Sequence, residues 1–175
     1  CSYNFKYIEW KPREEGGGFA GTYTRDDPNL PKTEKNERGQ DICVGTGNLL
    51  SPTGEHYGFT LDRETGKWEQ AVITMSSTQL KNSRKLNSLV AQQTVQTTQG
   101  PRPAPSYSRM YQLRTKGESN EHGDWCSWDI GLAENSVITD INLYRAAKAF
   151  SQAVTKGGVQ AKHVSQDGVS TDAPF

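Results

Sequence analysis

Short segments in which apolar and polar residues alternate recur along this chain, and they restrict it to a mainly β fold. The alternation is clearest near the N-terminus, where Tyr3, Phe5 and Tyr7 are separated by polar residues and Trp10 ends the segment. A two-residue period places such side chains on one face of a strand. We predict this first strand over 3–10 and further strands over 19–23, 57–61, 68–75, 107–115 and 125–130.

Two segments show helical spacing instead. The first follows the capping residues at 76–78 and runs to Gln93; the second covers 140–154 and has Thr139 as its predicted N-cap. Together these elements predict an α+β, mainly β fold: a small antiparallel OB-like barrel or sheet with a mid-chain helix and a C-terminal helix. Ferredoxin-like and split-sheet arrangements remain open alternatives.

Composition limits the size of the core. The chain has 175 residues, of which 33% are hydrophobic, and its mean hydropathy is −0.80. A small core must therefore coexist with much solvated loop or tail. We predict one OB-like nucleic-acid-binding domain over 1–154, interrupted by long loops at 25–41 and 94–106, and a flexible C-terminal tail over 155–175.

Neither a metal site nor a catalytic constellation is evident. Three cysteines and three histidines are scattered without the short spacings of zinc or disulfide frameworks, and no nucleophile, base or carboxylate pair stands at diagnostic spacing. We therefore expect a protein that is not an enzyme and that needs no metal and no cofactor. The sequence has no membrane-length apolar run and no signal-peptide pattern, so we also expect a soluble protein that binds no membrane.

Charge is neutral in sum and segregated in position. The 20 basic and 20 acidic residues cancel, yet the stretch 76–117 contains seven basic and no acidic residues, whereas 118–140 contains six acidic and no basic residues. A segregated basic stretch is a common footprint of polyanion binding, although a solvated helix face gives the same pattern. The basic residues include Lys81, Arg84 and Lys85, which helical spacing places on one face.

Aromatic residues interleaved with cations on strands point to single-stranded nucleic acid. Bases stack on exposed rings while Lys and Arg follow the phosphates, and the interaction tolerates any base. At least half of these rings are expected to be ordinary core. The candidate nucleic-acid-binding residues are Trp10, Lys11, Arg13, Trp68, Lys81, Arg84, Lys85, Tyr107, Arg109, Tyr111 and Arg114.

Three runs of the sequence resemble a known group of proteins. They are WKPREEGGGF from Trp10, ITMSSTQLKNSRKLNS from Ile73, and YQLRTKGESNEHGDWCSWDI from Tyr111. They are similar to tailed-bacteriophage single-stranded DNA-binding or replication proteins with an OB-like fold, over roughly residues 3–135. The resemblance implies a phage protein that coats single-stranded DNA during replication or recombination, in the cytoplasm of the infected bacterial host.

The end of the chain carries a second resemblance. It finishes Asp172, Ala173, Pro174, Phe175, which is similar to the tip of bacterial single-stranded DNA-binding proteins. That resemblance implies that Asp172, Pro174 and Phe175 bind phage or host replication proteins.

Two other classes of function remain open. The segregated charges also suit a structural or assembly protein of the phage particle, in which the basic stretch of one copy meets the acidic stretch of the next and forms a homo-oligomer. A small inhibitor of a host enzyme is a third interpretation, which rests only on size and solubility.

Overall fold

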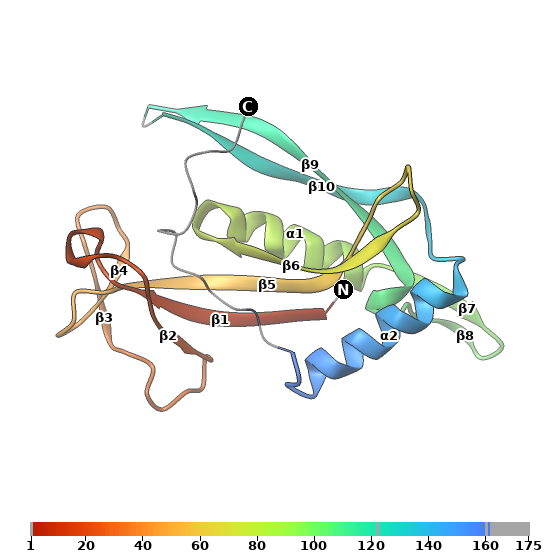
Figure 1. Cartoon of the computed structure of the whole chain (residues 1–175), viewed down its shortest axis with the longest axis horizontal. Coiled ribbons are helices and arrows are strands. Elements are labelled where there is room, and N and C mark those ends of the chain that lie inside the picture. The colour runs from red at the N-terminus through yellow and green to blue at the C-terminus, as the bar shows by residue number, and fades with distance from the viewer. Residues whose placement is uncertain (1, 122, 160, 162–175) are drawn as a thin grey trace. The chain divides into compact units, whose positions relative to one another are not determined.

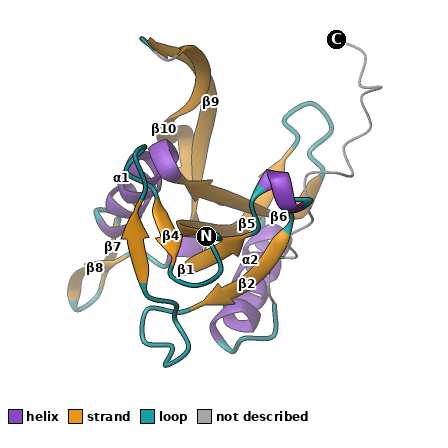
Figure 2. Ribbon diagram, turned by 90° about the vertical axis from the view of Figure 1, so that its left-hand side faces the viewer, coloured by secondary structure: helices purple, strands orange, loops and turns teal. Residues whose placement is uncertain are grey.

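The computed structural model describes residues 2–121, 123–159 and 161. The strands are β1 (Ser2–Trp10), β2 (Phe19–Tyr23), β3 (Thr33–Lys35), β4 (Asp41–Cys43), β5 (Leu49–Leu61), β6 (Trp68–Ser76), β7 (Thr94–Thr97), β8 (Gly100–Pro103), β9 (Arg109–Asn120) and β10 (Gly123–Val137). The helices are α1 (Leu80–Ala91) and α2 (Ile141–Thr155), with short 3-10 turns η1 (Arg13–Glu15), η2 (Ser77–Gln79) and η3 (Ser106–Ser108). Strands outweigh helices, as Figure 2 shows, and the predicted α+β, mainly β class is confirmed.

The chain divides into two compact units, which are described separately. Of the described residues, unit 1 comprises 2–4, 54–121 and 123–159, and unit 2 comprises 5–53 and 161. Strands β1 and β5 contribute residues to both units. All described strand pairs with a printed register are antiparallel, and the described strands form three open sheets rather than a closed barrel. A single domain over 1–154 with a separate tail stays a prediction.

In unit 2 the strands lie in the order β2-β1-β5-β4-β3. Its interior holds a buried carboxylate, Glu9, which accepts hydrogen bonds from the Tyr23 hydroxyl at 2.6 Å and from Asn48 Nδ2 at 2.6 Å. Thr46 Oγ1 donates a longer bond of 3.4 Å to the same carboxylate. Burial alone would raise the pKa of Glu9, but these donors favour its charged form and hold the pKa below the usual 4.5.

In unit 1 the long β9–β10 hairpin lies alongside α1, as Figure 1 shows. Met75 on β6, Leu86 on α1 and Ile130 on β10 form the buried cluster between these elements. Polar contacts add to the packing, because Asn82 Nδ2 donates to Ser127 Oγ at 2.9 Å and Gln79 Nε2 donates to the carbonyl of Cys126 at 3.2 Å. The hairpin is therefore attached to α1 by both apolar and polar contacts.

Several predicted elements are confirmed within a few residues. The strand expected over 19–23 is β2, the strand expected over 68–75 is β6, and both helices form where helical spacing indicates them. These segments have a clear period, so local sequence specifies them. The caps expected at 76–78 are not confirmed, because α1 begins after Gln79 and neither Ser76 nor Gln79 makes a side-chain cap hydrogen bond.

The prediction of an open loop over 94–106 is wrong in part. Strands β7 and β8 pair there as a hairpin, with Gln96 opposite Pro101. Gly100 takes a φ of +98°, and Thr97 Oγ1 donates to the Gly100 carbonyl at 2.7 Å, so the turn is well defined. Proline is tolerated because this two-stranded sheet gives each strand an edge with no ladder partner.

Other boundaries also move. The predicted loop over 25–41 contains β3, and the predicted strand over 57–61 is only the end of β5. The strand predicted over 107–115 extends to Asn120 in β9, and the strand predicted over 125–130 begins at Gly123 in β10, with Gly117 opposite Cys126 inside the ladder. Pairing between strands decides where a strand ends, and the residue pattern of one strand alone carries no information about its partner.

Helix α2 begins one residue later than the predicted cap implies. The side chain of Asp140, rather than that of Thr139, accepts hydrogen bonds from the backbone N–H of Asn142 at 2.7 Å and of Leu143 at 3.3 Å. Its carboxylate also faces the positive end of the helix dipole, which a neutral hydroxyl at Thr139 would not exploit.

Candidate nucleic-acid interface

The predicted cationic face of α1 is present and partly neutralised. Lys81, Arg84 and Lys85 are all exposed, as their spacing predicts. However, Lys81 Nζ lies 3.0 Å from Glu118 Oε2, and Lys85 Nζ lies 3.3 Å from Asp129 Oδ1. Within the described residues Arg84 makes no ion pair, so it is the cation of this face whose charge is uncompensated.

The two charged stretches of the sequence meet in the β9–β10 hairpin. Antiparallel pairing sets Arg114, which is exposed, opposite Asp129, and Lys116 Nζ lies 3.0 Å from Glu118 Oε1. Surface ion pairs of this kind contribute only about 0–1 kcal/mol each to stability. Their consequence is electrostatic: charges segregated along the chain are brought together in space.

Glu118 is the centre of this charge cluster. Its carboxylate accepts from Lys81 and Lys116, and also from the indole N–H of Trp125 at 3.2 Å. Its side chain is 17% exposed although both lysines are about half exposed. Hydrogen bonds from Lys116 and Lys81 hold the pKa of Glu118 at about 2.

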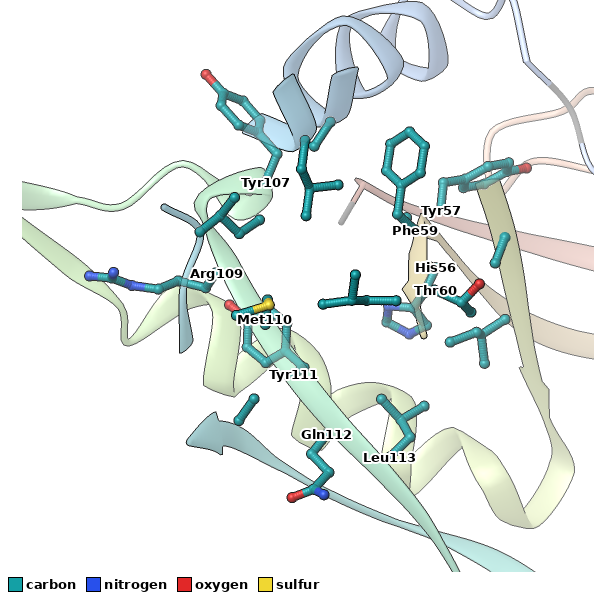
Figure 3. A pocket seen from close by; sticks show the side chains of 18 of the residues that line it. His56, Tyr57, Phe59, Thr60, Tyr107, Arg109, Met110, Tyr111, Gln112 and Leu113 are labelled. Carbon is teal, nitrogen blue, oxygen red and sulfur yellow. The ribbon is translucent and has the colours of Figure 1, made fainter. Parts of the chain in front are cut away.

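A cavity of about 940 Å³ within unit 1 collects three of the predicted residues, Tyr107, Arg109 and Tyr111. Figure 3 shows Tyr107 from η3, Tyr111 from β9 and Phe59 from β5, whereas the guanidinium of Arg109, also on β9, points away from the rings of Phe59 and Tyr111. The rings of Trp128 and Phe150 also line it. Concave sites with apolar walls and a few polar groups are typical of ligand binding.

Two polar atoms at this cavity lack a partner within the described residues. Arg109 donates through Nη2 to the carbonyl of Thr94 at 3.1 Å, but its Nε is buried without an acceptor. The hydroxyl of Tyr111 is buried in the same way, and burial raises its pKa. An unsatisfied buried polar group costs about 1–3 kcal/mol, so these two atoms are a local cost to the stability of the fold beside the cavity.

The predicted aromatic residues are packed as well as accessible. Tyr107 contacts Tyr144 edge to face at 5.5 Å, and Tyr111 packs against the Met75 cluster. Trp68, 38% exposed, contacts Phe59 edge to face at 5.0 Å. Each ring thus has a protein neighbour on one side.

The remaining predicted residues lie elsewhere. Trp10, Lys11 and Arg13 belong to unit 2, where Trp10 is half-buried and contacts Phe19 edge to face at 6.2 Å. Lys11 and Arg13 are exposed. The predicted partner-binding residues Asp172, Pro174 and Phe175 lie outside the described residues.

Sequence reasoning missed Lys116, Glu118 and Trp125 as a cluster. Lys116 and Glu118 share one strand parity, which was a usable signal, but Trp125 joins them only through its register opposite Glu118. It also missed a buried pair in unit 1: His56 Nε2 lies 2.9 Å from Ser83 Oγ. Both residues are about 1% exposed, and burial lowers the pKa of His56 to about 4, so its ring is neutral near pH 7.

The described residues offer neither a metal-binding cluster nor a membrane-spanning helix. Among residues 2–121, 123–159 and 161, no three His, Cys, Asp or Glu side chains gather closely enough to hold a metal ion. No helix in the same residues is long and apolar enough to cross a membrane. That the protein is not an enzyme and needs no cofactor stays a prediction.

Comparison with known proteins gives one match. No curated protein and no solved structure matches the chain. A family model described as Pam3 phage gp34-like protein matches residues 1–160, which is nearly the whole sequence. The chain therefore belongs to the Pam3 phage gp34-like family and is a phage protein.

Proposed function

We propose that this phage protein binds single-stranded DNA without sequence preference, by base stacking and phosphate contacts, during replication or recombination in the host cytoplasm. The observation that carries the proposal is the cavity of about 940 Å³ at which Tyr107, Arg109 and Tyr111 meet. Aromatic rings beside a guanidinium group are the chemistry that holds an unstacked base and its phosphate.

The cavity suits the unpaired bases of single-stranded DNA better than the paired bases of duplex DNA. A base can enter an apolar, ring-lined space only if it is not paired and stacked inside a helix. Base–aromatic stacking contributes about 1–3 kcal/mol per base, and Arg109 adds a positive charge to the residues that line the cavity. Duplex DNA could contact the exposed cations but could not place a base in the cavity.

The exposed face of α1 supplies the electrostatic part of the proposal. Arg84 carries an uncompensated charge. Lys81 and Lys85 make ion pairs at the surface, where salt screens the attraction and a phosphate can replace the carboxylate. Binding that rests on such contacts weakens steeply as salt rises.

Fluorescence anisotropy with a labelled strand of about 30 nucleotides, its duplex and an abasic strand of equal length tests the proposal at about 50 and 200 mM salt. We expect the single strand to bind more tightly than the duplex, and the abasic strand, which keeps the phosphates, to lose most of that advantage. Equal affinity for the single and abasic strands would contradict base stacking.

Matched variants separate a specific contact from a general loss of charge. Arg84→Ala removes the uncompensated cation of α1, whereas Arg145→Ala removes an exposed cation of α2 outside the predicted set. We expect Arg84→Ala to reduce the slope of log affinity against log salt concentration by the equivalent of about one phosphate contact. Arg145→Ala should leave this slope unchanged.

Assembly of the phage particle is the competing function. The ion pairs Lys81–Glu118 and Lys85–Asp129 join the two charged stretches within one chain, so these pairs need no second copy. Absence of DNA binding together with a concentration-dependent oligomer would favour that function.

A further inference from the structure

We infer that Lys81, Lys116 and the indole N–H of Trp125 form a binding site for a phosphodiester of single-stranded DNA, and that Glu118 occupies this site when DNA is absent. The inference rests on the proposed function, because it names a phosphate site and a means of regulation for that same surface. Lys116 and Trp125 are new to the set of candidate DNA contacts.

The geometry of the cluster supports an anion site. Lys81 Nζ lies 3.3 and 3.0 Å from the two carboxylate oxygens of Glu118, Lys116 Nζ lies 3.0 Å from Oε1, and Trp125 Nε1 lies 3.2 Å from Oε2. Three donors from three elements thus converge on one two-oxygen acceptor. A phosphodiester also presents two charged, non-bridging oxygens, and charge-assisted bonds from Lys suit either anion.

The charge balance leaves the site attractive to DNA. Two lysines face one carboxylate, so the cluster keeps a net positive charge. Lys81 and Lys116 are 58% and 50% exposed in their side chains, so a phosphate can approach both from solvent. A DNA phosphate must displace Glu118 or share the three donors with it. The carboxylate therefore weakens DNA binding by direct competition.

Glu118 is not needed to attach the hairpin to α1. The Asn82–Ser127 and Gln79–Cys126 hydrogen bonds and the Met75, Leu86 and Ile130 cluster join the same elements independently. Neutralising Glu118 should therefore free the lysines without detaching β9–β10. This makes Glu118→Gln an informative variant.

The matched control is Asp124→Asn. Asp124 is exposed on the same hairpin and makes no ion pair within the described residues, and it adjoins Trp125 on the opposite strand face. Both variants remove one negative charge, but only Glu118→Gln removes the charge that the two lysines and the indole N–H share. A general charge effect would change DNA affinity equally in the two variants.

The experiment measures oligothymidylate binding by anisotropy for both variants, using about 30 nucleotides at about 50 to 200 mM salt. For Glu118→Gln we expect the affinity at the lower salt concentration to rise by at least about fivefold. The slope of log affinity against log salt concentration should steepen by about 0.7 for each lysine that gains a phosphate contact. Asp124→Asn should change affinity far less and leave the slope unchanged. If wild type binds and Glu118→Gln binds no better than Asp124→Asn, the inference is overturned.

A second readout works even if DNA does not bind. The Trp125 indole N–H signal, assigned with Trp125→Phe, is followed by NMR while inorganic phosphate is added to Glu118→Gln. We expect that signal to shift, and to shift less in wild type. A shift with phosphate but no DNA binding would keep the anion site and refute the proposed function, whereas no shift in either protein would overturn the anion site.

Discussion

In the interior of unit 1, His56 Nε2 lies 2.9 Å from Ser83 Oγ, so an imidazole on β5 hydrogen bonds to a helical hydroxyl on α1. Both side chains are buried. The pair satisfies polar atoms that the apolar surroundings would otherwise penalise. The same burial disfavours the charged imidazolium and makes the fold sensitive to acid.

The first prediction concerns that sensitivity. The unfolded chain takes up a proton at His56 near pH 6.5, but the folded chain does so only near pH 4. The unfolded state therefore binds more protons in this window, and stability falls as pH drops through it, by about 3 kcal/mol from this group. Urea unfolding of wild type and His56→Gln at several pH values measures the difference.

The two proteins should diverge in their pH dependence rather than only in absolute stability. If their free energies of unfolding change in parallel between pH 6.5 and 4, the His56 assignment is incorrect. Should His56→Gln not fold, the NMR titration of the wild-type imidazole gives the same answer, because a pKa near 6.5 would contradict burial.

A second prediction tests packing beside this pair. A Cβ added at Gly54 would lie 2.4 Å from Ser83 Oγ and 3.1 Å from a ring carbon of Tyr3. Gly54→Ala should therefore destabilise unit 1 by about 1–3 kcal/mol, as overpacking of a close-packed interior does. The control is Gly117→Ala on β9, where a Cβ meets nothing within 4 Å. Equal unfolding midpoints for the two variants would count against this close approach.

A third prediction concerns the buried carboxylate of unit 2. Tyr23→Phe removes a donor to Glu9, which should raise the pKa of Glu9 and cost about 1–3 kcal/mol. Tyr7→Phe is the control, because Tyr7 lies opposite Tyr23 in the β1–β2 register and does not bond to Glu9. Chemical denaturation at neutral pH compares the two.

The sign of the pH effect follows from the lowered pKa of Glu9. Its charged form is stabilised in the folded state, so its contribution is present above the unfolded pKa of 4.5 and is lost as pH falls through the folded value. Tyr23→Phe should show this acid-dependent loss more weakly than wild type. If both proteins lose the same stability as the pH falls, Tyr23 does not stabilise the carboxylate.

The fourth prediction addresses the cap of α2. Asp140→Ala should destabilise the helix by about 0.5–2 kcal/mol, because two backbone N–H groups lose their acceptor. Thr139→Ala should have almost no effect. Thermal unfolding of the two variants decides between Asp140 and Thr139 as the N-cap, and a larger loss for Thr139→Ala would restore the cap expected from sequence.

Segments with a strong local period were predictable. The strand at 19–23 and the helix that begins at Leu80 form as expected, since each has a clear apolar period of its own. The hairpin at 94–103 was not, because its proline- and glutamine-rich sequence lacks an apolar face and its pairing follows from Gly100 and cross-strand contacts. The three cations of α1 were also found from spacing alone, whereas the ion-pair partners of Lys81 and Lys85 were not.

The mainly β class, the two helices and the separation of charge into a basic and an acidic stretch can all be deduced from the residues alone. That these stretches meet follows from the folded chain, through the register that places Arg114 opposite Asp129 and Trp125 opposite Glu118. The folded chain also decides that Tyr107, Arg109 and Tyr111 share one cavity with Phe59. The physical reason is that period and composition are local properties of the chain, while register, ion pairing and cavity walls depend on contacts between residues distant in sequence.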